Sequence, residues 1–413
     1  MISNFIFNLI QRISFIKKYK LYDFFKQIIY PFLIKNISKL WKDRVDEKLI
    51  IMGAYYGAAF LDNPKYLFEY LNKNSDYKLV WIAKLREVSR VIRKKGFYVV
   101  SFFNFMTIKF LRKAKYIFIA HGAEDILPVK FSPKTTIFLT WHGTPIKKIN
   151  EGLENSYIYS KWADIFRLEL RFDQFIDYLL TATGNEKEHE ILVKSFKILP
   201  KKILDLGYPK NDILFNQNKI FIANLMKKYQ IPSNIEKIIL YCPTWRADLK
   251  LNFVFTSLDL KKLKNLLEEI NALFLIKAHK FVKEINLEDF HNIKLVDKDA
   301  DIQELLLFTD ILITDYSSVI FDFLLLDRPI LLYAYDLDNY SKTWGFYYNL
   351  EDIAPGPIFY NAEDLLNGIR NLDKIDNEFK EKRLEMRNRF NKFIDGKSIE
   401  RILNFLNIKF NQK

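Results

Sequence analysis

Residues able to bind phosphate or move protons follow four apolar runs of this chain, at 136–140, 237–242, 272–276 and 310–314. Those that follow directly are His142, Gly143, Thr144, Lys147, Arg246, Lys277, His279, Asp315, Ser317 and Ser318. A histidine takes up a proton near neutral pH, and guanidinium, ammonium and hydroxyl groups donate hydrogen bonds to phosphate. The pattern predicts chemistry on a phosphorylated substrate.

The apolar runs alternate with longer segments of helical period, which is typical of an α/β fold with mostly parallel sheets. In such folds ligands bind beyond the carboxyl ends of the strands, where these polar residues fall. At 413 residues the chain exceeds the usual size of one hydrophobic core, and two series of runs indicate two domains. The expected ranges are a segment at 1–45, domains at 46–210 and 211–375, and a helical tail at 376–413.

The stretch 313–329 predicts a strand ending at Thr314, a turn, and a helix from Ser317 to about Leu326. The free N–H groups and positive dipole end of such a helix bind a phosphate. Plain capping of the helix by Ser317 explains the same residues, so both interpretations stay open.

His142 has neighbours that favour a catalytic role. Gly143 lets a ligand approach the backbone, and Lys147 adds positive charge. The imidazole is suited to accept a proton from an attacking hydroxyl. A structural histidine fits the spacing equally well.

Two further cations carry the same ambiguity. Arg246 is suited to clamp a phosphate bidentately, or to pair with an acidic neighbour. Lys277 lies beside His279 and favours contact of that histidine with an anion, although His279 also fits a structural role.

The charge balance indicates an anionic partner. Lys and Arg outnumber Asp and Glu by 64 to 50, and residues 1–45 alone hold nine of the cations and two Asp. That segment is interleaved with aromatic residues at helical spacing, so we expect an amphipathic helix lying on an anionic membrane surface, or packed on the protein itself. Because the excess concentrates there, nucleic acid is disfavoured as a partner.

Several motifs are missing from the sequence. It has no Gly-rich P-loop, no GxGxxG, no HExxH and one cysteine, Cys242. Hydrolysis by a P-loop and dinucleotide redox chemistry are therefore disfavoured. We predict neither a cofactor nor a metal.

Six segments in order resemble the CDP-glycerol glycerophosphotransferase family, which holds teichoic acid primases and polymerases and related capsule enzymes. They are DNPKYLFEYL (62–71), WHGTPIKKI (141–149), GYPKNDIL (207–214), YCPTWR (241–246), ITDYSSVIFDFLLLDRP (313–329) and APGPI (354–358). The resemblance implies a GT-B fold, in which two Rossmann-like domains face a cleft. It also implies a peripheral enzyme on the cytoplasmic membrane face that transfers an alditol phosphate from a CDP-alditol to a lipid-linked or polymer acceptor and releases CMP.

The resemblance also implies roles for single residues. His142 is the general base and His279 contacts the donor phosphates; Arg246 stabilises charge. Ser317 and Ser318, with Asp315 beside them, hold the pyrophosphate, and Asp322 approaches the nucleotide. Gly143, Thr144, Lys147 and Lys277 have supporting roles.

The chain departs from the family pattern at Lys280, and also at Trp344 and Asn349, where the change puts donor or acceptor specificity in doubt. The choice of glycerol or ribitol stays open. A GT-B glycosyltransferase that uses a nucleotide-sugar, including a CMP-linked one, is the alternative. It differs in leaving no donor phosphate in the product.

Overall fold

The structure is a computed structural model of the chain. It describes residues 44–127, 129, 131–149, 175–244, 246, 257–277, 287–297 and 299–410. The expected amphipathic segment, except for its last two residues, and His279 lie outside these ranges. Within them, no helix combines the length and the apolar character needed to cross a membrane.

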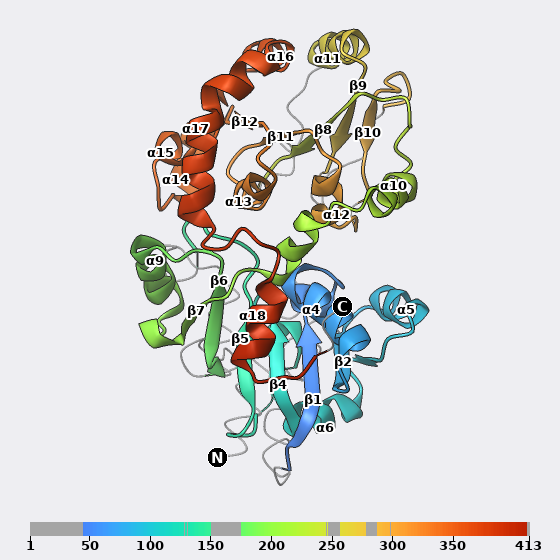
Figure 1. Cartoon of the computed structure of the whole chain (residues 1–413), viewed down its shortest axis with the longest axis vertical. Helices are drawn as coiled ribbons and strands as arrows, with labels where there is room; N and C mark the ends of the chain where they lie inside the picture. Colours follow the sequence, from blue (N-terminus) through green and yellow to red (C-terminus); the bar gives the residue numbers. More distant parts are fainter. Residues whose placement is uncertain are drawn as a thin grey trace, which may run out of the picture. The chain divides into compact units, whose positions relative to one another are not determined.

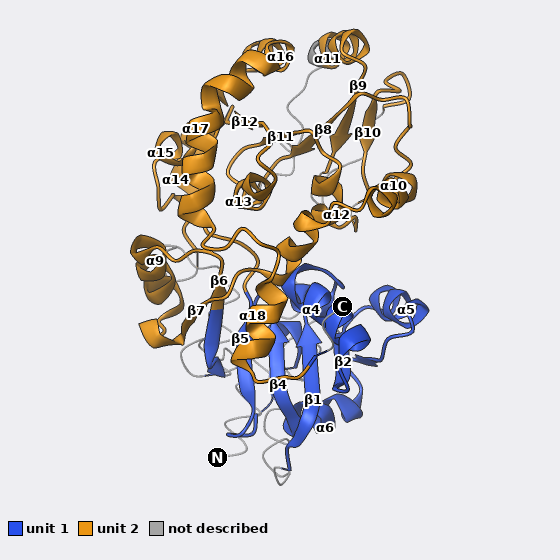
Figure 2. Cartoon of the chain, viewed as in Figure 1, with its two compact units in different colours: residues 1–140, 154–179, 410–413 blue, residues 141–153, 180–409 orange. Residues whose placement is uncertain are grey.

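Two compact units make up the chain (Figure 2). Unit 1 comprises residues 1–140, 154–179 and 410–413, and unit 2 comprises residues 141–153 and 180–409. The segment that carries His142 is grouped with unit 2. The contacts of residues 142–149 with other parts of unit 2, described below, account for this grouping.

The first sheet has seven strands in the order β3-β2-β1-β4-β5-β6-β7 (Figure 1). The strands are β1 (Asp46–Gly53), β2 (Lys78–Ala83), β3 (Val99–Ser101), β4 (Ala114–Ile119), β5 (Thr136–Leu139), β6 (Tyr178–Thr181) and β7 (Ile203–Asp205). Helices α4 (Asp62–Asn74), α5 (Arg86–Lys94) and α6 (Phe105–Lys113) connect the first four strands. The described pairings among β1 to β6 are all parallel, and β1 and β4 are buried along most of their length, as strands covered on both faces are.

The second sheet has six strands in the order β10-β9-β8-β11-β12-β13, again with parallel pairs. The strands are β8 (Lys237–Cys242), β9 (Ala272–Ile276), β10 (Ile293–Leu295), β11 (Ile311–Thr314), β12 (Ile330–Tyr333) and β13 (Ile358–Phe359). The α/β fold with parallel sheets that the sequence predicted is confirmed.

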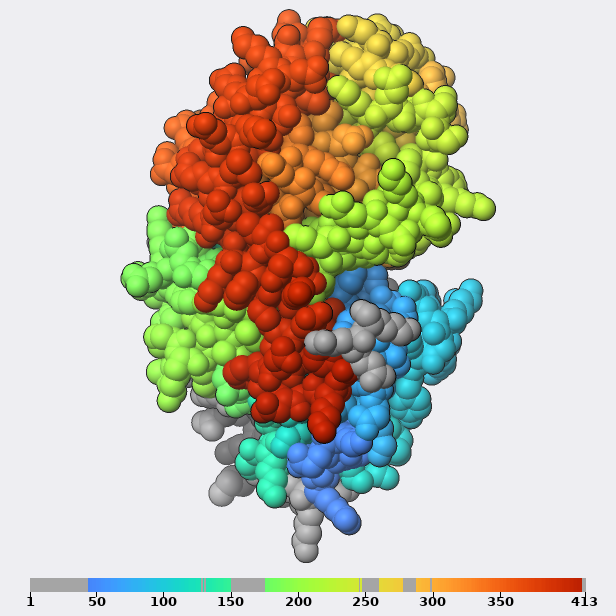
Figure 3. Space-filling model, in the orientation of Figure 1, coloured from blue at the N-terminus to red at the C-terminus, as the bar shows by residue number. Residues whose placement is uncertain are grey.

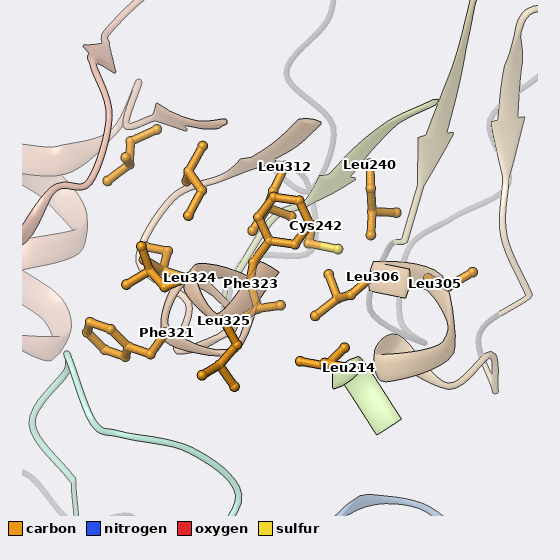
Figure 4. Packing of buried hydrophobic residues seen from close by; sticks show 14 of the residues in the cluster. Leu214, Leu240, Cys242, Leu305, Leu306, Leu312, Phe321, Phe323, Leu324 and Leu325 are labelled. Atoms are coloured by element: carbon orange, nitrogen blue, oxygen red, sulfur yellow. The ribbon is translucent and has the colours of Figure 1, made fainter. Parts of the chain in front are cut away.

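Successive residues of the second sheet face opposite layers of the core. Leu240 and Leu312 pack with α12 (Ile302–Leu307) and α13 (Val319–Phe323), as Figure 4 shows. Ile239 and Ile313 pack on the other face with α11 (Ser257–Glu269) and α16 (Ala362–Arg370). Because side chains alternate along a strand, the near-continuous apolar runs follow from burial of both faces.

The remaining helices of unit 2 cover its edges. They are α9 (Glu186–Phe196), α10 (Lys219–Lys228), α14 (Leu337–Trp344), α15 (Leu350–Ile353), α17 (Leu372–Phe390) and α18 (Ser398–Phe405), with the 3-10 helices η6 (Pro200–Lys202), η7 (Pro209–Phe215) and η8 (Leu324–Leu326). Figure 3 shows α17 at the surface, and it is anchored in the core by Met386 and Phe390. Short 3-10 helices η3 (Tyr55–Gly57) and η4 (Ala123–Asp125) lie in unit 1.

Candidate active site

The loop that carries His142 is tightly constrained. Trp141 adopts a φ of 51°, which is costly for a residue with a side chain, and its ring packs on those of His142 and Phe196 at centroid distances of 4.1 and 4.7 Å. Gly143 has a φ of 154°, and a Cβ there would lie 2.5 Å from the Oγ of Ser318. Only glycine therefore lets the loop approach the start of α13 so closely.

The turn before α13 has the predicted form. β11 ends at Thr314, and the helical segment runs through α13 and η8 to Leu326. The Oγ of Ser317 accepts a long hydrogen bond of 3.4 Å from the N–H of Val319, and no side-chain cap is made by Ser318. Both serines are half-buried. The capping that the sequence left open is present but weak.

Arg246 is bonded to carboxylates. Its Nε and Nη2 donate to Asp336 at 2.6 and 2.9 Å, and Nη2 also donates to Asp315 at 2.8 Å. Its Nη1 donates to the carbonyl of Thr244 at 2.6 Å. Burial acts to lower the pKa of the guanidinium, but the hydrogen bond to Asp336 and the charges of both carboxylates outweigh it and raise that pKa. The rings around the guanidinium belong to Tyr316, Tyr335 and Tyr340.

Asp315 is fully committed to this cluster. It accepts hydrogen bonds from the N–H and hydroxyl of Thr244 and from the N–H of Tyr316, besides the one from Arg246. Since a buried carboxylate needs such donors, Asp315 fixes the turn from which α13 starts. The geometry matches the pairing of Arg246 with acidic neighbours that the sequence left as one alternative.

Lys147 lies beside the same cluster but differs from Arg246 in its interactions and in its pKa. Its backbone forms an antiparallel bridge with Phe346, and its ammonium lies 5.9 Å from the ring centre of Tyr340. Within the described ranges that ammonium has no hydrogen bond or ion pair. Burial lowers the pKa of Lys147 to about 8; the charge of Asp315 opposes this fall and that of Arg246 adds to it. A desolvated, unpaired ammonium favours an anionic ligand.

Asp322 lies on α13, the helix that follows this turn, and is almost fully buried, at 3% exposure. Its oxygens accept hydrogen bonds from Lys210 at 2.7 Å and from Asn211 and Gln303 at 2.9 Å. Lys210 also donates to the main-chain carbonyl of His142 at 2.9 Å. Asp322 is thus linked to the loop of His142 through one side chain.

The structure brings most of the predicted residues of unit 2 together. Gly143 contacts Ser318, and Lys210 connects Asp322 to the main chain of His142. Lys147, on the same loop as His142, lies beside Asp315 and Arg246. Thr144 is buried at 2% exposure, and its hydroxyl has no hydrogen-bond partner in the described part of the chain.

Lys277 is not part of these contacts. It follows β9, donates to the carbonyl of Asp297 at 3.3 Å, and has a pKa lowered by burial. His279, two residues further on, lies outside the described residues.

Sequence reasoning missed Lys210, Gln303 and Asp336. The motif GYPKNDIL (207–214), which contains Lys210, spans the boundary expected between the two domains. Its match to the family pattern was the one signal that it belongs to the site. Asp336 and Gln303 carry no local signal, because their partners lie 90 and 19 residues away in the sequence.

The arrangement suits transfer of a phosphoryl group. A histidine, an ammonium, two serine hydroxyls and a buried threonine hydroxyl are supplied by one loop and one helix start. Donors fixed in advance stabilise charge that develops on phosphate oxygens, and the imidazole is suited to accept a proton.

Comparison with known proteins gives concordant matches. A family model described as CDP-Glycerol:Poly(glycerophosphate) glycerophosphotransferase matches residues 36–407. The teichoic acid glycerol-phosphate transferase of Staphylococcus aureus is 33% identical over 382 residues, or 89% of this chain and 95% of that protein. The teichoic acid poly(glycerol phosphate) polymerase of Bacillus spizizenii is 34% identical over 358 residues, or 83% and 87% of the two chains.

A solved structure extends the likeness to the fold. The wall teichoic acid polymerase TagF has a TM-score of 0.77 to this chain at 27% identity, with 91% of this chain and 93% of that one covered. The likeness in sequence and in structure therefore spans both sheets.

Proposed function

Because the chain belongs to the CDP-glycerol:poly(glycerophosphate) glycerophosphotransferase family, we propose that it moves glycerol phosphate from CDP-glycerol to a hydroxyl of a membrane-linked acceptor and releases CMP. The polymer made is teichoic acid-like or capsular. The observation that carries the proposal is the close approach of Gly143 to Ser318 at the start of α13, with Lys147 on the same loop lacking a hydrogen bond or ion pair among the described residues.

The reaction assigns a task to each group. The acceptor hydroxyl attacks the β-phosphorus of the donor while His142 takes its proton. A new P–O bond forms between the β-phosphorus and the acceptor oxygen. The P–O bond between that phosphorus and CMP breaks, and CMP leaves with the bridging oxygen on its own phosphate. Lys147, Ser317, Ser318 and the hydroxyl of Thr144 bind the phosphate oxygens, since positioning and charge stabilisation dominate such transfers.

Arg246 and Asp315 act in this proposal by holding the turn before α13. All three nitrogens of the guanidinium already donate to oxygens of the protein, and its charge faces two carboxylates. We assign direct contact with the donor to Lys147 instead. Asp322 likewise supports the loop of His142, while His279 contacts the donor phosphates and Lys277 supports it, as the resemblance implies.

The wider setting is also proposed from the family. Two Rossmann-like domains form a GT-B enzyme with the acceptor on one domain and the donor on the other, and the basic segment 1–45 holds the protein on the cytoplasmic face of the membrane. Deleting residues 1–45 should release the protein from anionic liposomes and leave turnover of a soluble acceptor nearly unchanged. Continued pelleting of the deletion variant with liposomes would contradict the anchor.

The test of the function is acceptor-dependent release of CMP from CDP-glycerol, with CDP-ribitol offered in parallel. His142→Ala should abolish release, whereas His291→Ala, which removes an exposed histidine paired with Glu268 at 3.8 Å, should not. With a donor labelled in its β-phosphate, the label should enter the product. A product without label would instead support the glycosyltransferase.

A further inference from the structure

An ion pair buried in unit 2 is attached to the loop of the proposed base. Lys210 of η7 and Asp322 of α13 are 5% and 3% exposed, and Nζ and Oδ2 are 2.7 Å apart. Removing two such charges from water is costly, and an apolar pair of the same size commonly serves stability as well. The pair therefore calls for an explanation other than stability.

Asp322 is arranged to hold Lys210 in place. Its two oxygens also accept from the side-chain amides of Asn211 and Gln303, each at 2.9 Å. Three donors from η7 and α12 thus fix the carboxylate, and the carboxylate fixes one ammonium. A carboxylate engaged in this way has little capacity left for a nucleotide.

Lys210 uses a second hydrogen bond to hold the main chain of His142, whose carbonyl oxygen lies 2.9 Å from Nζ. The described peptide bonds are all trans, so the N–H of Gly143 points away from the carbonyl of His142 and from Lys210. Gly143 is confined on its other side by Ser318. One ammonium therefore sets the direction of the peptide that joins His142 to Gly143.

A second buried cation of unit 2 serves as a comparison for the pair of Lys210 and Asp322, because its ion pairs have a purely structural role. Arg383 is 3% exposed and pairs with Asp327 at 3.2 Å and Asp376 at 2.8 Å. Its one further hydrogen bond is to the carbonyl of Asp376, on its own helix. Arg383 thus joins a helix to a helix end, whereas Lys210 joins a helix to the loop of His142.

We propose that Lys210 and Asp322 are positioning residues for the transfer. Asp322 holds the ammonium of Lys210, and Lys210 orients the peptide between His142 and Gly143. This aims the imidazole at the acceptor hydroxyl and presents the N–H of Gly143 to an oxygen of the phosphoryl group in transit. The proposal rests on the proposed function, and it adds two residues that act through His142 without touching the substrate.

The kinetic test compares Lys210→Met, Asp322→Asn, the double variant and Arg383→Met in the full chain. A loop misplaced by an ångström costs about a hundredfold in rate, so kcat should fall about a hundredfold in the first three while KM for CDP-glycerol changes little. The double variant should regain thermal stability relative to Lys210→Met, because Asp322 no longer lies buried without its partner, but it should not regain kcat. Arg383→Met should lose stability and keep kcat.

A second readout does not depend on turnover. In protein labelled at its histidines, Lys210→Met should shift the imidazole NMR signals of His142, assigned with His142→Ala, and leave those of His291 in place. Unmoved His142 signals, or a double variant with the kcat of the wild type, would overturn the proposal. If the wild-type chain releases no CMP but the signals shift, the proposed function fails and the positioning of His142 stands.

Discussion

Arg246 and Lys147 lie beside the same carboxylate and differ in how their charge is matched. The guanidinium faces Asp315 and Asp336 and donates from every nitrogen, while the ammonium has no hydrogen bond or ion pair among the residues that the structure describes. Arg246 is buried and Lys147 is half-buried, and loss of water acts against the charge of both, but the pKa is raised in Arg246 and lowered to about 8 in Lys147. A cation paired with carboxylates stabilises the structure of the site, whereas a cation without such a pair is available to bind a ligand.

The difference has an origin in the chain. Arg246 follows β8, and Asp315 follows the adjacent strand β11, so neighbouring strands bring opposite charges together. Lys147 instead arrives on a segment that pairs with residues 345–347 through main-chain bonds and through hydrogen bonds between Ile149 and the hydroxyl of Tyr347. Those bonds place an ammonium beside the cluster without giving it a carboxylate of its own.

Replacing Arg246 should have the largest effect, and it should fall on stability. Arg246→Met leaves Asp315 and Asp336 buried without their cation, which costs about 3–5 kcal/mol. Urea unfolding of the full chain measures the loss, and Lys342→Met, on the exposed side of α14, is the control. A variant as stable as the wild type would mean that the tyrosine rings, not the ion pairs, hold the turn.

Lys147→Met should show the opposite behaviour. We expect kcat/KM for CDP-glycerol to fall about a hundredfold, as when one preorganised donor to a transition-state oxygen is lost. Stability should not decrease, since a desolvated charge without a partner is removed. The matched control is Lys148→Met, which keeps an unbranched side chain of similar length against Gly345. Equal losses in both variants would show that the two lysines act only through general charge.

The α/β fold and the helix start at Ser317 could be predicted because their signals are local. An apolar run of strand length, a turn and a serine that begins the helix follow one another within residues 310–326. The grouping of His142 with unit 2 could not be predicted, because it depends on long-range contacts such as those of Gly143 with Ser318 and of Lys210 with the carbonyl of His142.

The roles of charged residues were harder to predict for the same reason. A sequence shows that Arg246 and Asp322 are charged, but not that Asp336 and Lys210 neutralise them in the folded chain. Pairing across 90 or more residues decides whether a charge supports the structure or meets a ligand. Only contacts in three dimensions carry that information.

The titration of Lys147 also predicts that activity and stability change in opposite directions with pH. With a pKa of about 8, Lys147 is charged below that pH, so kcat/KM for the donor should decline above pH 8, and Lys147→Met should lack this limb. In the unfolded chain Lys147 stays protonated up to the ordinary pKa of lysine. Between pH 8 and that pKa the unfolded chain therefore binds more protons than the folded chain, so stability should rise with pH in this range. Rate profiles and urea midpoints at pH 7 to 10 measure both. A midpoint that falls with pH in the wild type relative to Lys147→Met would refute the depressed pKa.

The smallest effect is expected for Thr144, the neutral counterpart of Lys147. Its hydroxyl is buried and has no partner among the described residues, which costs free energy in the absence of a ligand. Thr144→Val keeps the shape and removes that cost, so stability should stay level or rise slightly. If the hydroxyl donates to a phosphate oxygen, kcat should fall about tenfold, the value of one net hydrogen bond of about 1.4 kcal/mol. An unchanged kcat would mean that only charged and main-chain groups bind the phosphate. The contrast between Lys147 and Arg246 would then be the main determinant of the site.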